Sequence, residues 1–201
     1  MTRLQVPTFL RWADLDAYGH VNNASMLRLL EEARIQAFWV SDAAGGGFDT
    51  SQATDPTQTA DGAVDGAVDG AVVGSVVGST TAVLDGRPGA DTFSLIARQE
   101  VEYLLPIGYT RKPLDIQLWI SHLGGASIDV CYEVCSPVGV EPFSIFTRAA
   151  TTLVLVDSTT MRPRRIHDLE RAAWLPYLEA PVQFNIRSRT PPAERSQIET
   201  S

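Results

Sequence analysis

The sequence lacks the features that mark secreted and membrane proteins. It has only two cysteines in 201 residues, which excludes a scaffold held together by several disulfides. No run of apolar residues approaches the roughly 18 that a membrane-spanning helix needs. Residues 1–14 contain no uninterrupted apolar stretch and no small-residue cleavage site, so they do not resemble a secretory signal peptide. We therefore expect a cytoplasmic protein that does not enter a membrane.

Several common enzyme motifs are also missing. The chain contains no GxSxG elbow, no Walker A loop and no GxGxxG turn, so it gives no support for a serine hydrolase, a nucleoside triphosphatase or a dinucleotide-binding fold. Its histidines and cysteines have no metal-ligand spacing, and we expect neither a metal nor a cofactor. The net charge of −8 argues against nucleic acid as a partner. A small anionic ligand would need only a local basic patch.

One region departs from an otherwise ordinary composition. The chain is 44% hydrophobic and 20% charged, as is usual for a globular protein, and its length favours a single domain. At residues 61–80, however, the sequence DGAVDGAVDGAVVGSVVGST repeats a glycine at every fourth position. That spacing suits neither a stable helix nor a core strand. We predict a low-complexity insertion at about 43–91, with a partly ordered lid over a pocket as the alternative.

The pattern after residue 23 predicts a helix from Ala24 to about Ser41, for which Asn23 is a suitable N-cap. Apolar residues recur there at the helical spacings of three and four, at Met26, Leu30, Ala33, Ala37 and Val40. The charged residues between them should form the solvated face or pair with other charges: Arg28, Glu31, Glu32 and Arg34.

Alternating apolar and polar residues predict five strands around this helix. The expected ranges are 4–12, 92–105, 114–120, 128–134 and 143–156. One helix followed by a run of antiparallel strands is an α+β arrangement, in which the sheet wraps around the apolar helix. The remaining segment has a short helical pattern at about 169–178.

Cys131 and Cys135 are expected to be free thiols. On a strand, residues four apart are separated by roughly 13 Å, whereas the Cα atoms of a disulfide lie within about 7 Å.

A polar motif stands between the first predicted strand and the helix. It reads RWADLDAYGHVNN at residues 11–23, and EEAR follows at 31–34. This combination resembles the hotdog-fold acyl-CoA thioesterases, namely the 4-hydroxybenzoyl-CoA thioesterase and bacterial acyl-CoA thioesterase types and, more distantly, the plant acyl-carrier-protein thioesterases. Weaker matches follow in the same order, VEYLLPI at 101–107, VLVD at 154–157 and RP at 162–163.

The resemblance covers about residues 5–43 and 92–168. It implies a hotdog fold, with a curved antiparallel sheet of about five strands around one long helix. The thioesterase-like domain would occupy residues 1–160, including the insertion, and residues 161–201 would form a C-terminal tail.

The resemblance also implies a reaction, the hydrolysis of an acyl-CoA thioester to a free acid and CoA. Asp16 would be the base or nucleophile, and the backbone N–H of Asn23 would stabilise the oxyanion. A helix N-terminus suits that task because its first N–H groups are unpaired and carry partial positive charge. Taken without the motif, Asp16 could equally be a carboxylate that caps a turn.

Other residues of the motif are expected to support this chemistry. Asp14 and Asn22 would fix the loop, and His20 would orient it or contact the thioester. Met26 stands where the family usually has an aromatic residue that lines the substrate channel. Arg111 and Lys112 could bind the phosphates of coenzyme A, and so could three arginines of the tail, Arg162, Arg164 and Arg165.

Three alternatives remain open at this stage. The carrier could be acyl carrier protein instead of coenzyme A, the protein could bind acyl thioesters without cleaving them, or it could hydrate an enoyl thioester. A single curved sheet leaves an exposed edge, so we expect a homodimer or homotetramer, and the resemblance implies a pocket at the subunit interface.

Overall fold

The computed structural model describes residues 2–40, 81–87 and 89–185. The repeat at 61–80 and most of the predicted insertion at 43–91 lie outside the described residues. The elements are β1 Leu4–Thr8, η1 Trp12–Asp14, α1 Asn23–Phe38, β2 Thr92–Tyr103, β3 Leu114–Leu123, β4 Ser127–Cys135, β5 Ile145–Asp157, α2 Asp168–Trp174 and η3 Leu175–Tyr177.

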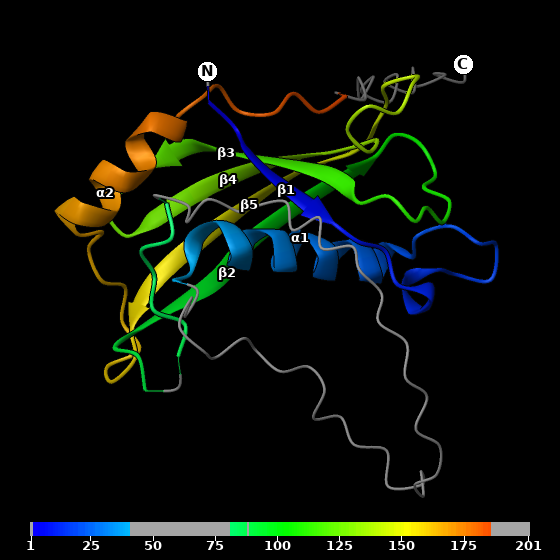
Figure 1. Ribbon diagram of the computed structural model, residues 1–201. Coiled ribbons are helices and arrows are strands. Elements are labelled where there is room, and N and C mark those ends of the chain that lie inside the picture. Colours follow the sequence, from blue (N-terminus) through cyan, green and yellow to red (C-terminus); the bar gives the residue numbers. More distant parts are fainter. Residues whose placement is uncertain (1, 41–80, 88, 186–201) are drawn as a thin grey trace, which may run out of the picture.

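Five antiparallel strands form one sheet in the order β1-β3-β4-β5-β2. The sheet curves around α1, which lies across its inner face (Figure 1). Register shifts between Ile96 and Arg98 in β2, and between Ile120 and His122 in β3, mark irregularities of the kind that bend strands. The predicted α+β fold is therefore confirmed, with β1 and β2 at the two edges of the sheet.

The start of α1 differs from the prediction in a way that matters for the site. Asn22, and not Asn23, is the N-cap, because its backbone is extended (φ −65°, ψ 142°) and its side chain accepts the Ala24 N–H at 2.8 Å. Asn23 is therefore the first helical residue. The helix ends at Phe38, earlier than the predicted Ser41, and β1 ends at Thr8, before the predicted Trp12.

The buried face of α1 packs on the sheet through Met26, Leu29, Leu30, Ala33, Ala37 and Phe38. Val40, the last residue of the predicted stripe, lies beyond the helix and is 53% exposed. Arg34 is an exception, because it is buried instead of solvated. Its guanidinium donates to the hydroxyl of Tyr132 on β4 at 3.0 Å, which gives the buried cation a polar partner. Glu32 pairs with Arg11 at 2.9 Å.

The chain after β5 packs against the domain. Trp174 of α2 is fully buried in the core, where its ring meets Phe38 edge to face at 6.0 Å. Its indole N–H donates to the carbonyl of Thr81 at 3.1 Å. Farther along, Val182 packs on Trp119 at the outer face of the sheet. The short helix predicted at 169–178 is present as α2 and η3.

Cys131 and Cys135 are free and buried, as predicted. Burial raises the pKa of the Cys135 thiol to about 12, so both side chains are packed as small apolar groups. In the part of the chain that the structure describes, no helix is long and apolar enough to cross a membrane.

Candidate active site

The loop before α1 is anchored by Asp14. Its carboxylate is 1% exposed and accepts hydrogen bonds from the backbone N–H of Arg11 at 2.7 Å and from the Arg11 guanidinium at 3.3 Å. The carbonyl of Asp14 accepts the N–H of Asn22 at 2.8 Å. Asp14 thus joins the two ends of the loop, which is the structural task expected of it.

Asp16 sits in a tight turn that holds one of its two carboxylate oxygens. Gly19 closes the turn, donating its N–H to the Asp16 carbonyl at 3.1 Å, and adopts the left-handed φ of 78° that favours glycine. The Oδ1 atom of Asp16 accepts the N–H groups of Tyr18 at 2.8 Å and His20 at 3.0 Å. Within the described residues Oδ2 has no hydrogen-bond partner, so the carboxylate is oriented and keeps one oxygen available.

The first turn of α1 has an unpaired backbone donor next to this loop. The Asn22 side chain takes the Ala24 N–H, but no hydrogen bond to the Asn23 N–H exists among the residues that the structure describes. The Tyr103 hydroxyl donates to the Asn23 carbonyl at 3.2 Å, and burial raises the pKa of Tyr103. The end of β2 is thereby tied to the first residue of the helix.

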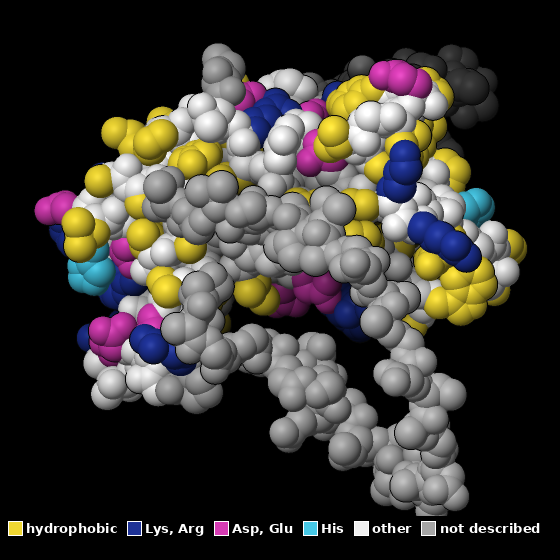
Figure 2. Space-filling model, viewed as in Figure 1, with side chains coloured by type: hydrophobic (Ala, Val, Ile, Leu, Met, Phe, Trp, Pro, Cys, Tyr) yellow, Lys and Arg dark blue, Asp and Glu magenta, His cyan; other side chains and the backbone are white. Residues whose placement is uncertain are grey.

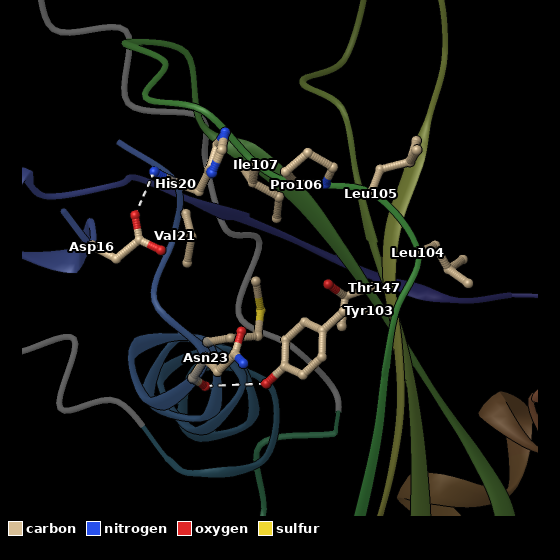
Figure 3. A pocket seen from close by; sticks show the side chains of 11 residues that line it. Asp16, His20, Val21, Asn23, Tyr103, Leu104, Leu105, Pro106, Ile107 and Thr147 are labelled. Atoms are coloured by element: carbon tan, nitrogen blue, oxygen red, sulfur yellow. Dashed lines mark hydrogen bonds between the residues drawn. The ribbon is translucent and has the colours of Figure 1, made fainter. Parts of the chain in front are cut away.

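These groups line one cavity of about 310 Å³. Its walls are the loop (Asp16, His20, Val21), the start of α1 (Asn23, Met26), residues 103–107 at the end of β2 and just beyond it, and Thr147 of β5. Figure 3 shows Asp16 and His20 on one side, Asn23 and Tyr103 together at the helix start, and Leu104–Ile107 along the other wall. The Val21 N–H donates to the Ile107 carbonyl at 2.8 Å, which joins the two walls.

Exposure falls from the mouth of the cavity to its floor. His20 is exposed and Asp16 is half-buried, whereas Met26 and Thr147 are each 1% exposed. Reactive polar groups therefore lie at the entrance, and the floor is apolar except for one hydroxyl.

Four of the seven site residues predicted from the sequence line this cavity: Asp16, His20, Asn23 and Met26. Asn22 does not line it and acts as the helix cap. Arg111 and Lys112 are exposed on the segment that continues from the 103–107 wall, and neither lines the cavity. Lys112 borders a separate hollow beside Asp115.

Arg164 is not available as a phosphate ligand, because its guanidinium is 15% exposed and paired with Glu170. It also donates to the Thr92 hydroxyl at 2.6 Å. Arg162 and Arg165 are exposed. Tyr103 and Thr147 were not predicted from the sequence as site residues. Tyr103 lies in the VEYLLPI match at 101–107, which could have indicated it, whereas Thr147 lies in none of the matching motifs.

Among the described residues, no group of three or more His, Cys, Asp or Glu side chains could hold a metal ion.

Comparisons with known proteins identify the family and the fold. The family model described as the thioesterase-like superfamily matches residues 10–180. No curated protein sequence matches the chain.

The fold is similar to several solved structures. The PA5185 protein of Pseudomonas aeruginosa strain PAO1 has a TM-score of 0.59 and 16% identity, over 90% of this chain and 94% of that one. A predicted thioesterase from Bacillus stearothermophilus has a TM-score of 0.57 and 16% identity, over 90% of this chain and 100% of that one.

A thioesterase from Thermus thermophilus, solved with coenzyme A and zinc, has a TM-score of 0.52 and 20% identity, over 87% of this chain and 92% of that one. Because these identities are low, the similarity to the three structures shows the fold alone. The family model, by contrast, spans most of the chain, and the chain therefore belongs to the thioesterase-like superfamily.

Proposed function

We propose that this protein hydrolyses an acyl-CoA thioester to a free acid and CoA, with Asp16 as base or nucleophile and the Asn23 N–H as oxyanion donor. Membership of the family supports thioester hydrolysis in general. The observation that carries the finer proposal is that the Asp16 carboxylate and the Asn23 N–H line the same cavity, where Oδ2 and this N–H have no partner among the described residues.

The Oδ2 atom of Asp16 suits either role. As a base, Oδ2 takes a proton from a water molecule, and the water oxygen attacks the thioester carbonyl carbon. As a nucleophile, Oδ2 attacks that carbon itself, and water then hydrolyses the resulting anhydride. In both routes the carbon–sulfur bond breaks, and CoA leaves as a thiolate that takes up the proton lost by the water molecule. The two bonds to Oδ1 hold the carboxylate in place, so little reorganisation is needed.

The start of α1 suits the negative charge that develops on the carbonyl oxygen. The Asn23 N–H is the first donor of the helix, where the aligned peptide dipoles add partial positive charge. The bond from Tyr103 to the Asn23 carbonyl holds this first turn against β2. His20 would orient the loop at the entrance, Asn22 would fix the helix start as its cap, and Met26 would contact the acyl chain.

Coenzyme A is the carrier that we favour over acyl carrier protein. The Thermus thermophilus thioesterase of similar fold was solved with coenzyme A. In this protein Arg111 and Lys112 are exposed on the segment beyond the 103–107 wall, where their charges would meet the phosphates of coenzyme A at the outer end of the pantetheine arm.

We also propose that the protein is a homodimer or homotetramer. β2 is an edge strand, and it exposes apolar side chains at Phe93 (44%), Leu95 (45%) and Ile96 (47%). An edge of this kind favours pairing with another strand. Tyr103 at the end of β2 lines the cavity, so a second copy on this edge would lie beside the pocket.

Two substitutions test the mechanism directly. Asp16→Asn keeps the size of the side chain and removes its basicity, and should lower kcat by about 10²–10⁴-fold. Asn23→Pro removes the proposed oxyanion donor, and proline is well tolerated at the first position of a helix. It should lower kcat by about 10²–10³-fold. Thiol release from a panel of acyl-CoAs measures both effects.

Asn23→Ala is the matched control, because it changes the side chain and keeps the N–H. It should retain most of the activity, and the thermal midpoints of all three variants should stay near that of the wild type. If Asn23→Pro is folded and fully active, the oxyanion assignment is wrong. If the wild type binds acyl-CoA and never releases thiol, the protein is a binder of acyl thioesters and not an enzyme.

A further inference from the structure

Thr147 is a buried hydroxyl that the mechanism above does not use. It lies on β5, between its register partners Tyr103 on β2 and Val134 on β4. The residue is 1% exposed, and within the described residues its Oγ1 atom has no hydrogen-bond partner. It nevertheless lines the same cavity as Asp16.

An unpaired buried hydroxyl costs free energy and is uncommon in native cores. Figure 3 shows the Thr147 oxygen turned toward the interior of the pocket, across from Val21 and Asn23. The neighbouring lining is mainly apolar, from Val21, Met26 and Ile107. Thr147 therefore adds a hydrogen-bonding group to the buried part of the lining, where Val21, Met26 and Ile107 offer hydrophobic contact.

Its depth separates this hydroxyl from the reacting atoms. Asp16 is half-buried and His20 is exposed, so a thioester held by Asp16 lies toward the entrance. Thr147 is buried as deeply as Met26, where the acyl chain would lie. A volume of about 310 Å³ is at the low end for small-molecule sites and suits a short acyl group.

We propose that Thr147 is a specificity-determining residue whose hydroxyl binds an oxygen substituent of the acyl group. This inference rests on the proposed function and names its substrate class: short acyl-CoAs with a hydroxyl or oxo group on the chain, in preference to plain alkyl acyl-CoAs of equal length. Without that substituent the hydroxyl stays unpaired in the complex, which penalises the alkyl substrate.

The test compares butanoyl-CoA with 3-hydroxybutanoyl-CoA and 3-oxobutanoyl-CoA. The wild type should have the higher kcat/KM for at least one oxygenated substrate. Thr147→Val removes only the hydrogen-bonding group and should reduce that preference about fivefold, the size expected of one hydrogen bond between neutral groups. Thr147→Ser keeps a hydroxyl and should restore most of the preference.

Thr151→Val is the matched control. Thr151 is on the same strand and equally buried, but it does not line this cavity, so its replacement should leave the preference unchanged. A preference that is the same in Thr147→Val and in the wild type overturns the inference and indicates that water satisfies the hydroxyl. An equal fall in Thr151→Val also overturns it, since the effect is then general to the core.

Binding to the Asp16→Asn variant, by calorimetry with the same three acyl-CoAs, separates this inference from the proposed function. A Thr147-dependent preference in binding, combined with no hydrolysis by the wild type, would support the acyl subsite and reject the enzyme. Hydrolysis without any dependence on Thr147 would support the enzyme and reject the subsite.

Discussion

The two ends of α1 differ in whether their terminal backbone groups have hydrogen-bond partners among the described residues. At the C-terminal end the helix carbonyls find partners in residues 81–84: the Thr81 hydroxyl donates to Ala37 at 2.6 Å, and the N–H of Leu84 donates to Phe38 at 3.0 Å. Trp174 then covers this end. At the N-terminal end, the Asn23 N–H faces a cavity and has no partner among the described residues.

Two carboxylates show the same contrast. Glu170, on the helix α2 whose Trp174 packs against Phe38, accepts the Arg164 guanidinium on both oxygens and the His167 N–H at 2.8 Å. Asp16, near the N-terminal end, keeps Oδ2 free within the described part of the chain. Because a buried polar group without a partner costs stability, we interpret the extensively paired end as structural and the incompletely paired end as the site. Figure 2 shows the surface over the N-terminal loop, where hydrophobic, basic and histidine side chains gather.

The largest expected effect on stability is at the C-terminal end of α1. Trp174→Ala removes the fully buried ring that packs on Phe38 and should lower the free energy of unfolding by about 3–5 kcal/mol. Urea denaturation measures the loss. Trp174 packs against Phe38, the last residue of α1, whereas the cavity lies at the start of this helix of 16 residues, which is about 24 Å long. The folded fraction of the variant should therefore hydrolyse thioesters with near wild-type kcat.

Leu169→Ala is the control for Trp174, because Leu169 lies on the same short helix and is 82% exposed. Its effect should stay within about 0.5 kcal/mol. If folded Trp174→Ala also had a much lower kcat than the wild type, the interpretation of one end of α1 as structural and the other as the site would be wrong.

A smaller loss in the free energy of unfolding is expected when the ion pair between Glu170 and Arg164 is removed. Burial alone raises the pKa of this carboxyl, but the hydrogen bonds from Arg164 and His167 outweigh it and hold the pKa below its ordinary value of 4.5. Glu170→Gln leaves Arg164 without its counter-charge and should cost about 2–3 kcal/mol near pH 7.

The pH dependence of Glu170→Gln follows from the direction of that shift. Since the folded pKa is depressed, the ionised carboxylate contributes its full stability above the unfolded pKa, and the contribution is lost as the pH falls through the folded pKa. The difference between wild type and Glu170→Gln in urea titrations should therefore be constant near neutral pH and shrink below about pH 4.5. A difference that grows on acidification would show that the carboxylate is not stabilised in the folded state.

The smallest effect concerns the cap of α1. Asn22→Ala removes the acceptor of the Ala24 N–H and should cost about 1 kcal/mol, seen as a lower thermal midpoint. Asn23→Ala should leave stability unchanged or raise it slightly, because alanine has the higher helix propensity and the Asn23 side chain makes no capping bond within the described residues. Equal losses in the two variants would contradict the assignment of Asn22 as the cap.

Local sequence patterns were sufficient for most of the fold. Spacings of three and four predicted α1, and alternation predicted all five strands, with errors confined to their ends. The ends are less certain because a single hydrogen bond, such as the cap at Asn22, decides where the helix begins. The distance along a strand was enough to predict that Cys131 and Cys135 do not pair.

What the sequence by itself determined is therefore a fold class, a family and a short motif around Asp16, because these depend on residues close together in the chain. Only the tertiary structure decided that Tyr103 and Thr147 share a cavity with Asp16, that Arg34 is buried against Tyr132 and that Trp174 completes the core. Such contacts join positions far apart in the chain, and they depend on strand register and packing, which periodicity along one segment does not encode.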